Sequence, residues 1–241
     1  ELPCDERAAI ARHVREIDRL GEDLAELEAA VAKETVGDAG VQRLLTIAGV
    51  NAIVASGIVA AIGDIARFKE PQKLVSYFGL NPRVRQSGLG LAQHGRISKH
   101  GRSHARALLV EAAWAAAKAP GPLRAFFLRI RNRRGHQVAA VATARKLTVL
   151  IWHVLTKGQD YLWARPSLVA AKRRQLELKA GAPSEKGKGR RGSAYAYNLK
   201  ELRDREREGA EQAERAYEHM IRRWKPKGAG KRPDGANEAR R

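Results

Sequence analysis

The stretch from Gly79 to Arg106 gathers the side chains of this sequence that could hold and attack a phosphate group. It contains one candidate nucleophile, Ser87, in a Gln-Ser-Gly turn, and no Asp or Glu occurs from Pro71 through Val110. Its basic residues are Arg83, Arg85, Arg96, Lys99, Arg102 and Arg106. Guanidinium groups match the geometry of phosphate oxygens, so the stretch predicts a site that binds a nucleic-acid backbone.

Ser87 is the candidate that could carry out covalent chemistry on a phosphodiester. After losing its proton, a serine hydroxyl can form a phosphoserine ester, which conserves the energy of the broken strand for rejoining. His94, His100 and His104 are candidate bases, but none has a spacing that requires this role. The alternative is that Ser87 is only a turn residue, because serine is common in glycine-rich turns.

Metal ligands are scarce in the middle of the chain. The carboxylates between residues 41 and 171 are Asp64, Glu70, Glu111 and Asp160, and no two of them are spaced as a pair of ligands. A zinc site on the three histidines is disfavoured because they stand among many cations. The sequence therefore predicts no metal site and no cofactor within this chain.

Charge is distributed unevenly along the 241 residues. Residues 1–40 contain 5 Lys and Arg against 11 Asp and Glu, residues 41–171 contain 20 against 4, and residues 172–241 contain 21 against 11. A strongly basic middle part is typical of a protein that binds a polyanion. The one cysteine excludes an internal disulfide. No apolar run reaches the roughly 18 residues that span a bilayer, so we expect a cytoplasmic protein without membrane contact.

The chain is expected to be mostly helical and to have three parts. Residues 1–40 are predicted to form a coiled-coil arm, residues 41–165 a helical domain, and residues 166–241 a basic, partly disordered extension. In the arm, apolar residues at heptad spacing would line a seam for a helical hairpin or a dimer. The alternative is an amphipathic helix packed on its own domain. The seam consists of Ile10, His13, Ile17, Leu20, Leu24, Leu27 and Val31.

The domain begins with two apolar helices joined by a turn in LLTIAGVNAIVA, a pattern that resembles a helix-hairpin-helix. Gly49 and Asn51 are expected to adopt positive φ, so that the amides opening the second helix face a phosphate without reading bases.

After this turn, the sequence predicts an irregular hairpin, which presents the basic stretch, among several helices. The hairpin is expected over 83–97, and helices over 71–78, 106–118, 122–134, 136–155, 168–179 and 198–224. The segments 180–192 and 226–241 are predicted to be disordered because they hold too few apolar residues to offset chain entropy.

Three ordered motifs in this sequence resemble one family. LLTIAGVNAIVASGIVAAIGDIARF, KLVSYFGLNPRVRQSG and HGRISKHGRSHARALLVEAAW lie within roughly residues 42–155. They resemble the C-terminal transposase domain of DEDD-type insertion-sequence transposases, the insertion sequence one-ten group of bridge-RNA-guided recombinases. The resemblance implies DNA transposition with Ser87 as the catalytic serine, and a structured guide RNA as partner. It also implies Mg²⁺ bound by four acidic residues of an N-terminal RuvC-like domain.

The sequence departs from this family in two ways. Asn51 stands where the second glycine of the turn is usual, and the chain begins at the arm, with Glu1, without a RuvC-like domain. This suggests a fragment, which we expect to form homo-oligomers through its arm and to bind nucleic acid without cutting or joining it. The alternatives are a non-catalytic helix-hairpin-helix module that binds DNA or RNA, and a basic RNA-binding protein.

Overall fold

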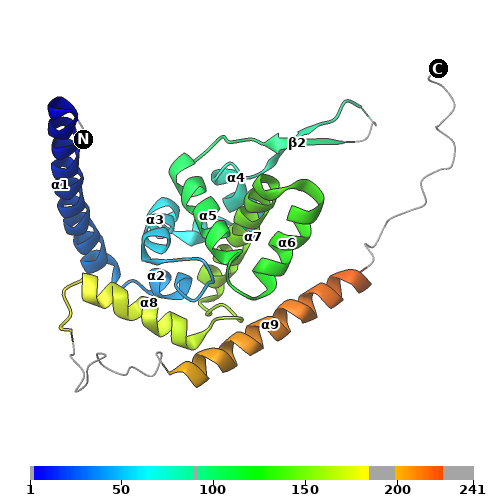
Figure 1. Cartoon of the computed structure of the whole chain (residues 1–241). Coiled ribbons are helices and arrows are strands. Elements are labelled where there is room, and N and C mark those ends of the chain that lie inside the picture. Colours follow the sequence, from blue (N-terminus) through cyan, green and yellow to red (C-terminus); the bar gives the residue numbers. More distant parts are fainter. Residues whose placement is uncertain (1–2, 89–91, 185–198, 225–241) are drawn as a thin grey trace.

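The computed structural model describes residues 3–88, 92–184 and 199–224, and its elements are mostly helical, as predicted. Figure 1 shows a long helix, α1, projecting from a group of packed helices, with a two-stranded ribbon at the top of the group. The segments predicted to be disordered lie outside the described residues, apart from 180–184. The elements are α1 (Cys4–Thr35), α2 (Ala39–Leu44), α3 (Ala52–Ile62), η1 (Ile65–Arg67), α4 (Pro71–Tyr77), β1 (Pro82–Arg85), β2 (Gln93–Ile97), α5 (Ser103–Ala116), α6 (Pro122–Arg134), α7 (His136–Lys157), α8 (Pro166–Lys179) and α9 (Lys200–Arg223).

The core forms around α7, which contacts α2, α4, α5 and α6. Small and apolar residues on α7, among them Ala140, Ala144, Leu147 and Ile151, are buried and let these neighbours approach closely. Within the described part of the chain, α7 is the one helix long and apolar enough to cross a membrane. Because α7 packs against four other helices, its apolar composition is that of the core helix of a folded domain.

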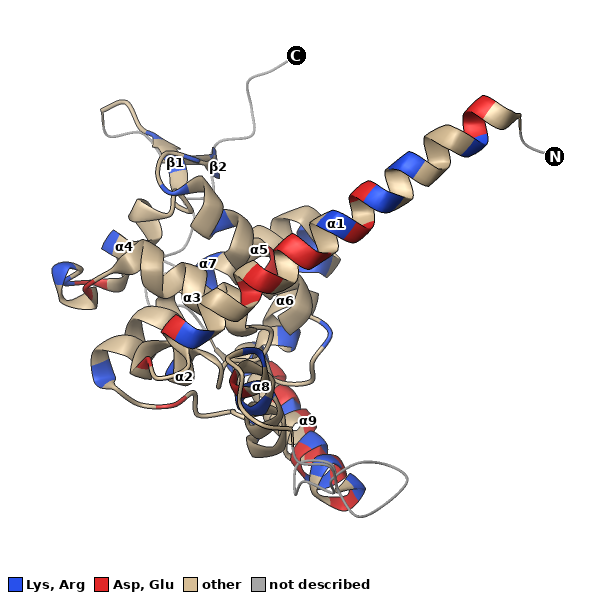
Figure 2. Cartoon of the chain, turned by 90° about the vertical axis from the view of Figure 1, so that its left-hand side faces the viewer, with Lys and Arg blue, Asp and Glu red and all other residues tan. Residues whose placement is uncertain are grey.

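Helix α1 leaves most of its apolar seam in solvent. Ile17 and Leu27 are 66% and 64% exposed, and Ala32, near the C-terminal end, is the buried residue of the helix. Figure 2 shows α1 extending away from the domain, with acidic bands nearest the domain. Residues 10–27 are exposed throughout. The alternative that this helix packs on its own domain is therefore wrong over most of its length.

The turn between α2 and α3 differs from the expectation for Asn51. Gly49 has a φ of +85°, as expected, but Asn51 has a φ of −100°. The reason is that Asn51 is the N-cap of α3, a position that requires extended backbone. Its Oδ1 accepts a hydrogen bond from the amide of Val54 at 2.9 Å. The predicted positive φ of Asn51 is therefore wrong. Its side chain instead caps α3 by pairing with an amide that has no partner within the helix.

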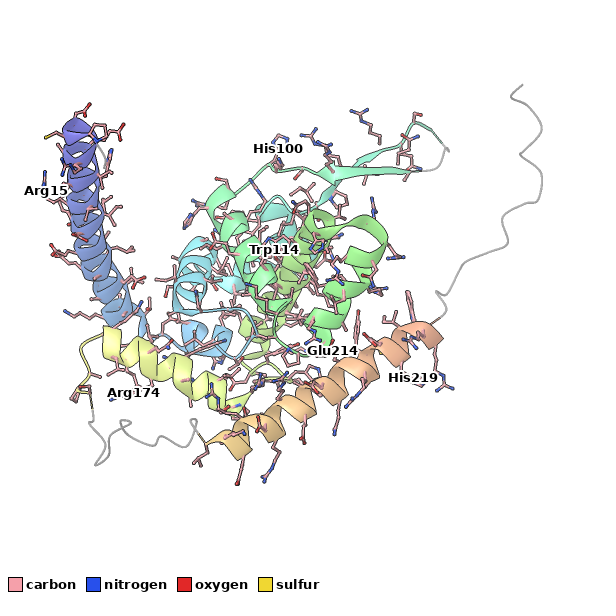
Figure 3. The ribbon with its side chains drawn as sticks, viewed as in Figure 1. Arg15, His100, Trp114, Arg174, Glu214 and His219 are labelled. Carbon is pink, nitrogen blue, oxygen red and sulfur yellow. The ribbon has the colours of Figure 1, made fainter. Side chains whose placement is uncertain are left out.

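Two glutamates of α9 cap the N-termini of other helices. Glu214 is 8% exposed, accepts a hydrogen bond from the amide of Gly121 at 3.0 Å, and pairs with Arg124 at 3.2 Å. Glu206 accepts hydrogen bonds from the amide and the hydroxyl of Ser167. Neither α6 nor α8 has a side-chain cap of its own, so α9 supplies both. Figure 3 places Glu214 where α9 passes α6.

Lys172 of α8 is partly buried against the turn that follows α2. Its Nζ donates hydrogen bonds to the carbonyl oxygens of Leu45 at 2.8 Å and Ile47 at 3.0 Å. Burial lowers the pKa of Lys172 from 10.5 to about 8, because desolvation disfavours the charged amine. Between these two pH values the unfolded chain retains a proton that the folded chain has lost.

We therefore expect the contribution of Lys172 to the free energy of unfolding to rise with pH. Because one pKa unit corresponds to 1.36 kcal/mol, the rise is at most about 3 kcal/mol between pH 8 and pH 10.5. Denaturant unfolding of the wild type and of Lys172→Met across this range measures it. The wild type should gain stability relative to the variant as the pH rises, and parallel curves would contradict the expectation.

Candidate nucleic-acid interface

The basic stretch forms an antiparallel hairpin that projects from the helices (Figure 1). β1 pairs with β2 in a register that joins Val84 to His94 and Arg85 to Gln93. Side chains alternate along a strand, so Arg83 and Arg85 share one face of the ribbon. These two arginines and Arg96 are exposed. A two-stranded ribbon is narrow enough to enter the major groove of a duplex, and this one carries positive charge.

Ser87 follows β1 near the tip of the hairpin and is exposed. Gly88, the next residue, has a φ of +58°, a backbone conformation that favours glycine and turns the chain. His100 and His104 belong to the opposite end of the ribbon, where the chain enters α5. The side chain of His94 lies outside the described part of the structure. The structure therefore places two of the three candidate bases at the base of the hairpin and Ser87 at its tip.

Two glycines allow the base of the hairpin to lie against α4. At Gly79, which has a φ of +70°, an added Cβ would lie 2.5 Å from the carbonyl oxygen of His100. At Gly101, with a φ of +126°, it would lie 2.1 Å from the carbonyl oxygen of Tyr77. Both neighbours are backbone atoms, so a side chain at either position would force the segments apart.

The side chain of Arg106 holds the loop before α5 in place. The Nη1 of Arg106 donates hydrogen bonds to the carbonyl oxygens of Phe78 at 3.0 Å and Lys99 at 3.2 Å. Lys99 itself is exposed and has a φ of +59°, which is unusual for a residue with a side chain. Arg106 thus braces the base of the hairpin from within, while Lys99 leaves its side chain in solvent.

Arg102 lies beside an aromatic residue that sequence reasoning did not single out. Its Nε donates a hydrogen bond to the hydroxyl of Tyr77 at 2.8 Å, across 25 residues of sequence. Arg67, also missed, lies over the Tyr77 ring with its guanidinium carbon 4.7 Å from the ring centre. No motif in the sequence joins these three residues, because they belong to three separate elements brought together by the fold.

Gly49 and Asn51 lie in another part of the domain. An added Cβ at Gly49 would lie 2.4 Å from the carbonyl oxygen of Ala112, in the second half of α5, whereas the loop that follows the hairpin enters α5 at its first residue, Ser103. At 1.5 Å per residue these two points of α5 are separated by about 13 Å. The structure therefore does not bring the turn together with the basic hairpin.

The acidic side chains of the domain do not converge on one point. Among the described residues, no three His, Cys, Asp or Glu side chains form a group that could bind a metal ion. Asp64 accepts a hydrogen bond from the amide of Ala66 at 2.8 Å, and Asp160 lies 4.0 Å from Arg173. Within the described part of the chain, these carboxylates therefore do not fit a Mg²⁺ site.

Comparison with known proteins finds similarity over the segment that holds the hairpin. Residues 41–128 match the family model "Transposase IS116/IS110/IS902 family". A protein named "Probable family 20 transposase" from Pseudomonas aeruginosa is 33% identical over 150 residues, which cover 61% of this chain and 44% of that protein. The transposase for insertion sequence element IS1111A of Coxiella burnetii is 35% identical over 124 residues, 50% of this chain and 34% of that protein.

A third relative is named for gene inversion and not for transposition. The pilin gene-inverting protein of Moraxella bovis is 27% identical over 120 residues, which cover 49% of this chain and 37% of that protein. This chain spans less than half the length of each of the three relatives. Residues 41–128, with the hairpin and the helices α2 to α5 around it, are thus similar to the transposases of the IS116/IS110/IS902 family.

Proposed function

We propose that this chain is the DNA-binding and strand-transfer part of an insertion-sequence transposase. The observation that carries the proposal is the exposed basic hairpin with Ser87 near its tip. The hairpin lies inside the segment that matches the transposase family. The basic face formed by Arg83 and Arg85 contacts the phosphates of the DNA backbone. Ser87 attacks a neighbouring phosphodiester of that backbone.

In the proposed reaction, the Oγ of Ser87 attacks the phosphorus atom of the DNA strand. A bond forms between Oγ and phosphorus, and the bond from phosphorus to the leaving deoxyribose oxygen breaks. The hydroxyl proton leaves Oγ, and the leaving oxygen gains a proton. Guanidinium groups on the hairpin neutralise the charge that develops on the non-bridging oxygens. The reverse attack by a deoxyribose hydroxyl on the phosphoserine rejoins a strand, as gene inversion or transposition requires.

The proposal extends to partners that a longer protein would use. The exposed seam of α1 is proposed to pair with a second copy of the chain, which would give a homo-oligomer. A structured guide RNA and Mg²⁺ bound by a separate acidic domain are proposed from the family resemblance. The chain by itself is expected to bind nucleic acid without cutting it, because a serine hydroxyl without a positioned base is a weak nucleophile.

Ser87→Ala in a full-length protein that carries this chain tests the catalytic part. We expect strand exchange to fall by about a thousand-fold or more, since removal of a nucleophile eliminates the covalent route. DNA binding should remain within about two-fold of the wild type, because Ser87 contributes no charge. The SDS-resistant protein–DNA adduct that reports the phosphoserine ester should disappear.

Ser98→Ala is the matched control, since Ser98 directly follows β2 at the base of the same hairpin. Its strand exchange should equal that of the wild type. Unchanged strand exchange in Ser87→Ala, with DNA binding intact, would overturn the nucleophile assignment. That result would favour the second reading, a module that binds DNA or RNA without catalysis.

A further inference from the structure

Three side chains form a positively charged cluster at the base of the hairpin: Arg102, already predicted to bind a nucleic-acid backbone, and Arg67 and Tyr77, which were not. The hydroxyl of Tyr77, the last residue of α4, accepts a hydrogen bond from Nε of Arg102 at 2.8 Å. The guanidinium of Arg67, the last residue of η1, lies 4.7 Å from the centre of the Tyr77 ring and 4.6 Å from that of Phe68. Two guanidinium groups thus lie against the side chain of Tyr77, one at its hydroxyl and one over its ring.

This arrangement holds two like charges together at the protein surface. Arg67 and Arg102 are exposed, and Tyr77 is partly buried. Among the described residues, no ion pair joins either arginine to a carboxylate; the acidic partners of the chain belong to other arginines and lysines. Asp64, the acidic residue nearest to Arg67 in the sequence, accepts a hydrogen bond from the amide of Ala66. The cluster is therefore open to an anion from solution.

The backbone of the loop fixes the cluster in position. Gly101 approaches the carbonyl oxygen of Tyr77 as only a glycine can, and the amide of Arg102 donates a hydrogen bond to the same oxygen at 3.1 Å. The Tyr77 hydroxyl also donates to the carbonyl oxygen of Ala61 at 3.2 Å. The two guanidinium groups lower the pKa of Tyr77, Arg102 more than Arg67. The site is thus held by main-chain contacts before any ligand arrives, which reduces the entropic cost of binding.

We propose that Arg67 and Arg102, held in place by the ring and the hydroxyl of Tyr77, bind one phosphate of a nucleic-acid strand at the base of the hairpin. This inference rests on the proposed function and adds a second contact point to it. β1 leads from Pro82, at the base of the hairpin, toward Ser87, so the cluster and Ser87 lie toward opposite ends of the hairpin. The cluster acts as a positioning site that sets which phosphodiester reaches Ser87.

Salt-dependent binding of duplex DNA by this chain tests the proposal. Each phosphate contact adds about one unit to the slope of log affinity against log salt, so Arg67→Gln should lower the slope by about one. At fixed salt, the affinity should fall about ten-fold. Arg67→Lys should keep the slope and lose a few-fold in affinity, because the charge remains and the planar fork is lost. Tyr77→Phe should likewise keep the slope, since it removes no charge.

Arg205→Gln is the matched control, because Arg205 is an exposed arginine on α9 and the change in net charge is the same. Its slope should equal that of the wild type. An Arg67→Gln variant that behaves like Arg205→Gln, while the wild type binds DNA, would overturn the positioning site and leave the proposed function standing. Failure of the wild type to bind any DNA would instead sink the proposed function.

A second measurement separates the anion site from nucleic-acid binding. Titration with inorganic phosphate, followed by the NMR signal of the Arg102 Nε–H proton, should shift that signal in the wild type. The shift should be lost in Arg67→Gln. If the Arg102 signal does not shift at phosphate concentrations that saturate ordinary arginine sites, the cluster does not bind phosphate. This conclusion would hold whatever the DNA-binding result. Equal thermal unfolding of wild type and variants confirms that the cluster, and not the fold, has changed.

Discussion

Replacing Gly49 with alanine is expected to lower the free energy of unfolding by about 3 kcal/mol or more. Two costs add at this position. The φ of +85° disfavours any residue with a Cβ, and the new Cβ would lie 2.4 Å from the carbonyl oxygen of Ala112 and 2.5 Å from the amide nitrogen of Ala116. Both contacts are with the backbone of α5, which cannot rotate away as a side chain can. Denaturant unfolding of the purified chain measures the loss.

Gly63→Ala is the matched control for this prediction. Gly63 also has a positive φ, +63°, but an added Cβ there would meet nothing within 4 Å. We therefore expect only the conformational cost, about 1 kcal/mol. If Gly49→Ala instead kept its stability and lost only nucleic-acid affinity, the packing explanation would be wrong. The backbone-binding role predicted for the turn would then be favoured.

Replacing Leu20 and Leu24 together with glutamate is expected to abolish self-association of the chain. These side chains are 52% and 57% exposed in the single chain, and a contiguous apolar face of this kind marks an interaction surface. Each leucine buried in a dimer contributes on the order of 2 kcal/mol, so the double variant should raise the dissociation constant by more than about a hundred-fold. Sedimentation equilibrium over a range of protein concentrations measures it.

Two controls separate lost pairing from lost folding. Ala25→Glu changes the same helix outside the seam and should leave the dissociation constant unchanged. The unfolding transition of the domain should be the same in the double variant, because residues 10–27 are exposed and contribute nothing to its core. A wild-type chain that stays monomeric at about 100 µM, or an Ala25→Glu variant that dissociates equally, would refute the pairing of the arm.

Local signals in the sequence predicted most of the elements. Pro122 and Gly135 mark the two ends of α6, and the structure begins and ends that helix beside them. The proline at the start of the basic stretch and its glycines predicted a hairpin, which β1 and β2 confirm. The absence of acidic residues around Ser87 identified the basic surface. These features follow from residues a few positions apart, whose conformational preferences act before the chain folds.

The sequence could not predict contacts between distant elements, because they depend on how close two backbones come after packing. It placed Asn51 at a positive φ, whereas the fold uses this side chain to cap α3. It gave no sign that Glu206 and Glu214 of α9 would cap α8 and α6. It separated Arg67 and Arg102 by more than thirty residues, whereas the fold brings both guanidinium groups to the side chain of Tyr77.

The sequence by itself thus predicted the helical elements, the basic hairpin with Ser87 in it, and the resemblance to a transposase family. The tertiary structure decided that Gly49 serves packing and that the seam of α1 stays uncovered over residues 10–27. It also decided which arginines brace the loop and which remain open to an anion. The reason is physical. Composition and periodicity act locally, on backbone conformation and on charge along the chain. Which charged side chains become neighbours, and which of them lack a counter-ion, depends on how closely distant backbone segments pack.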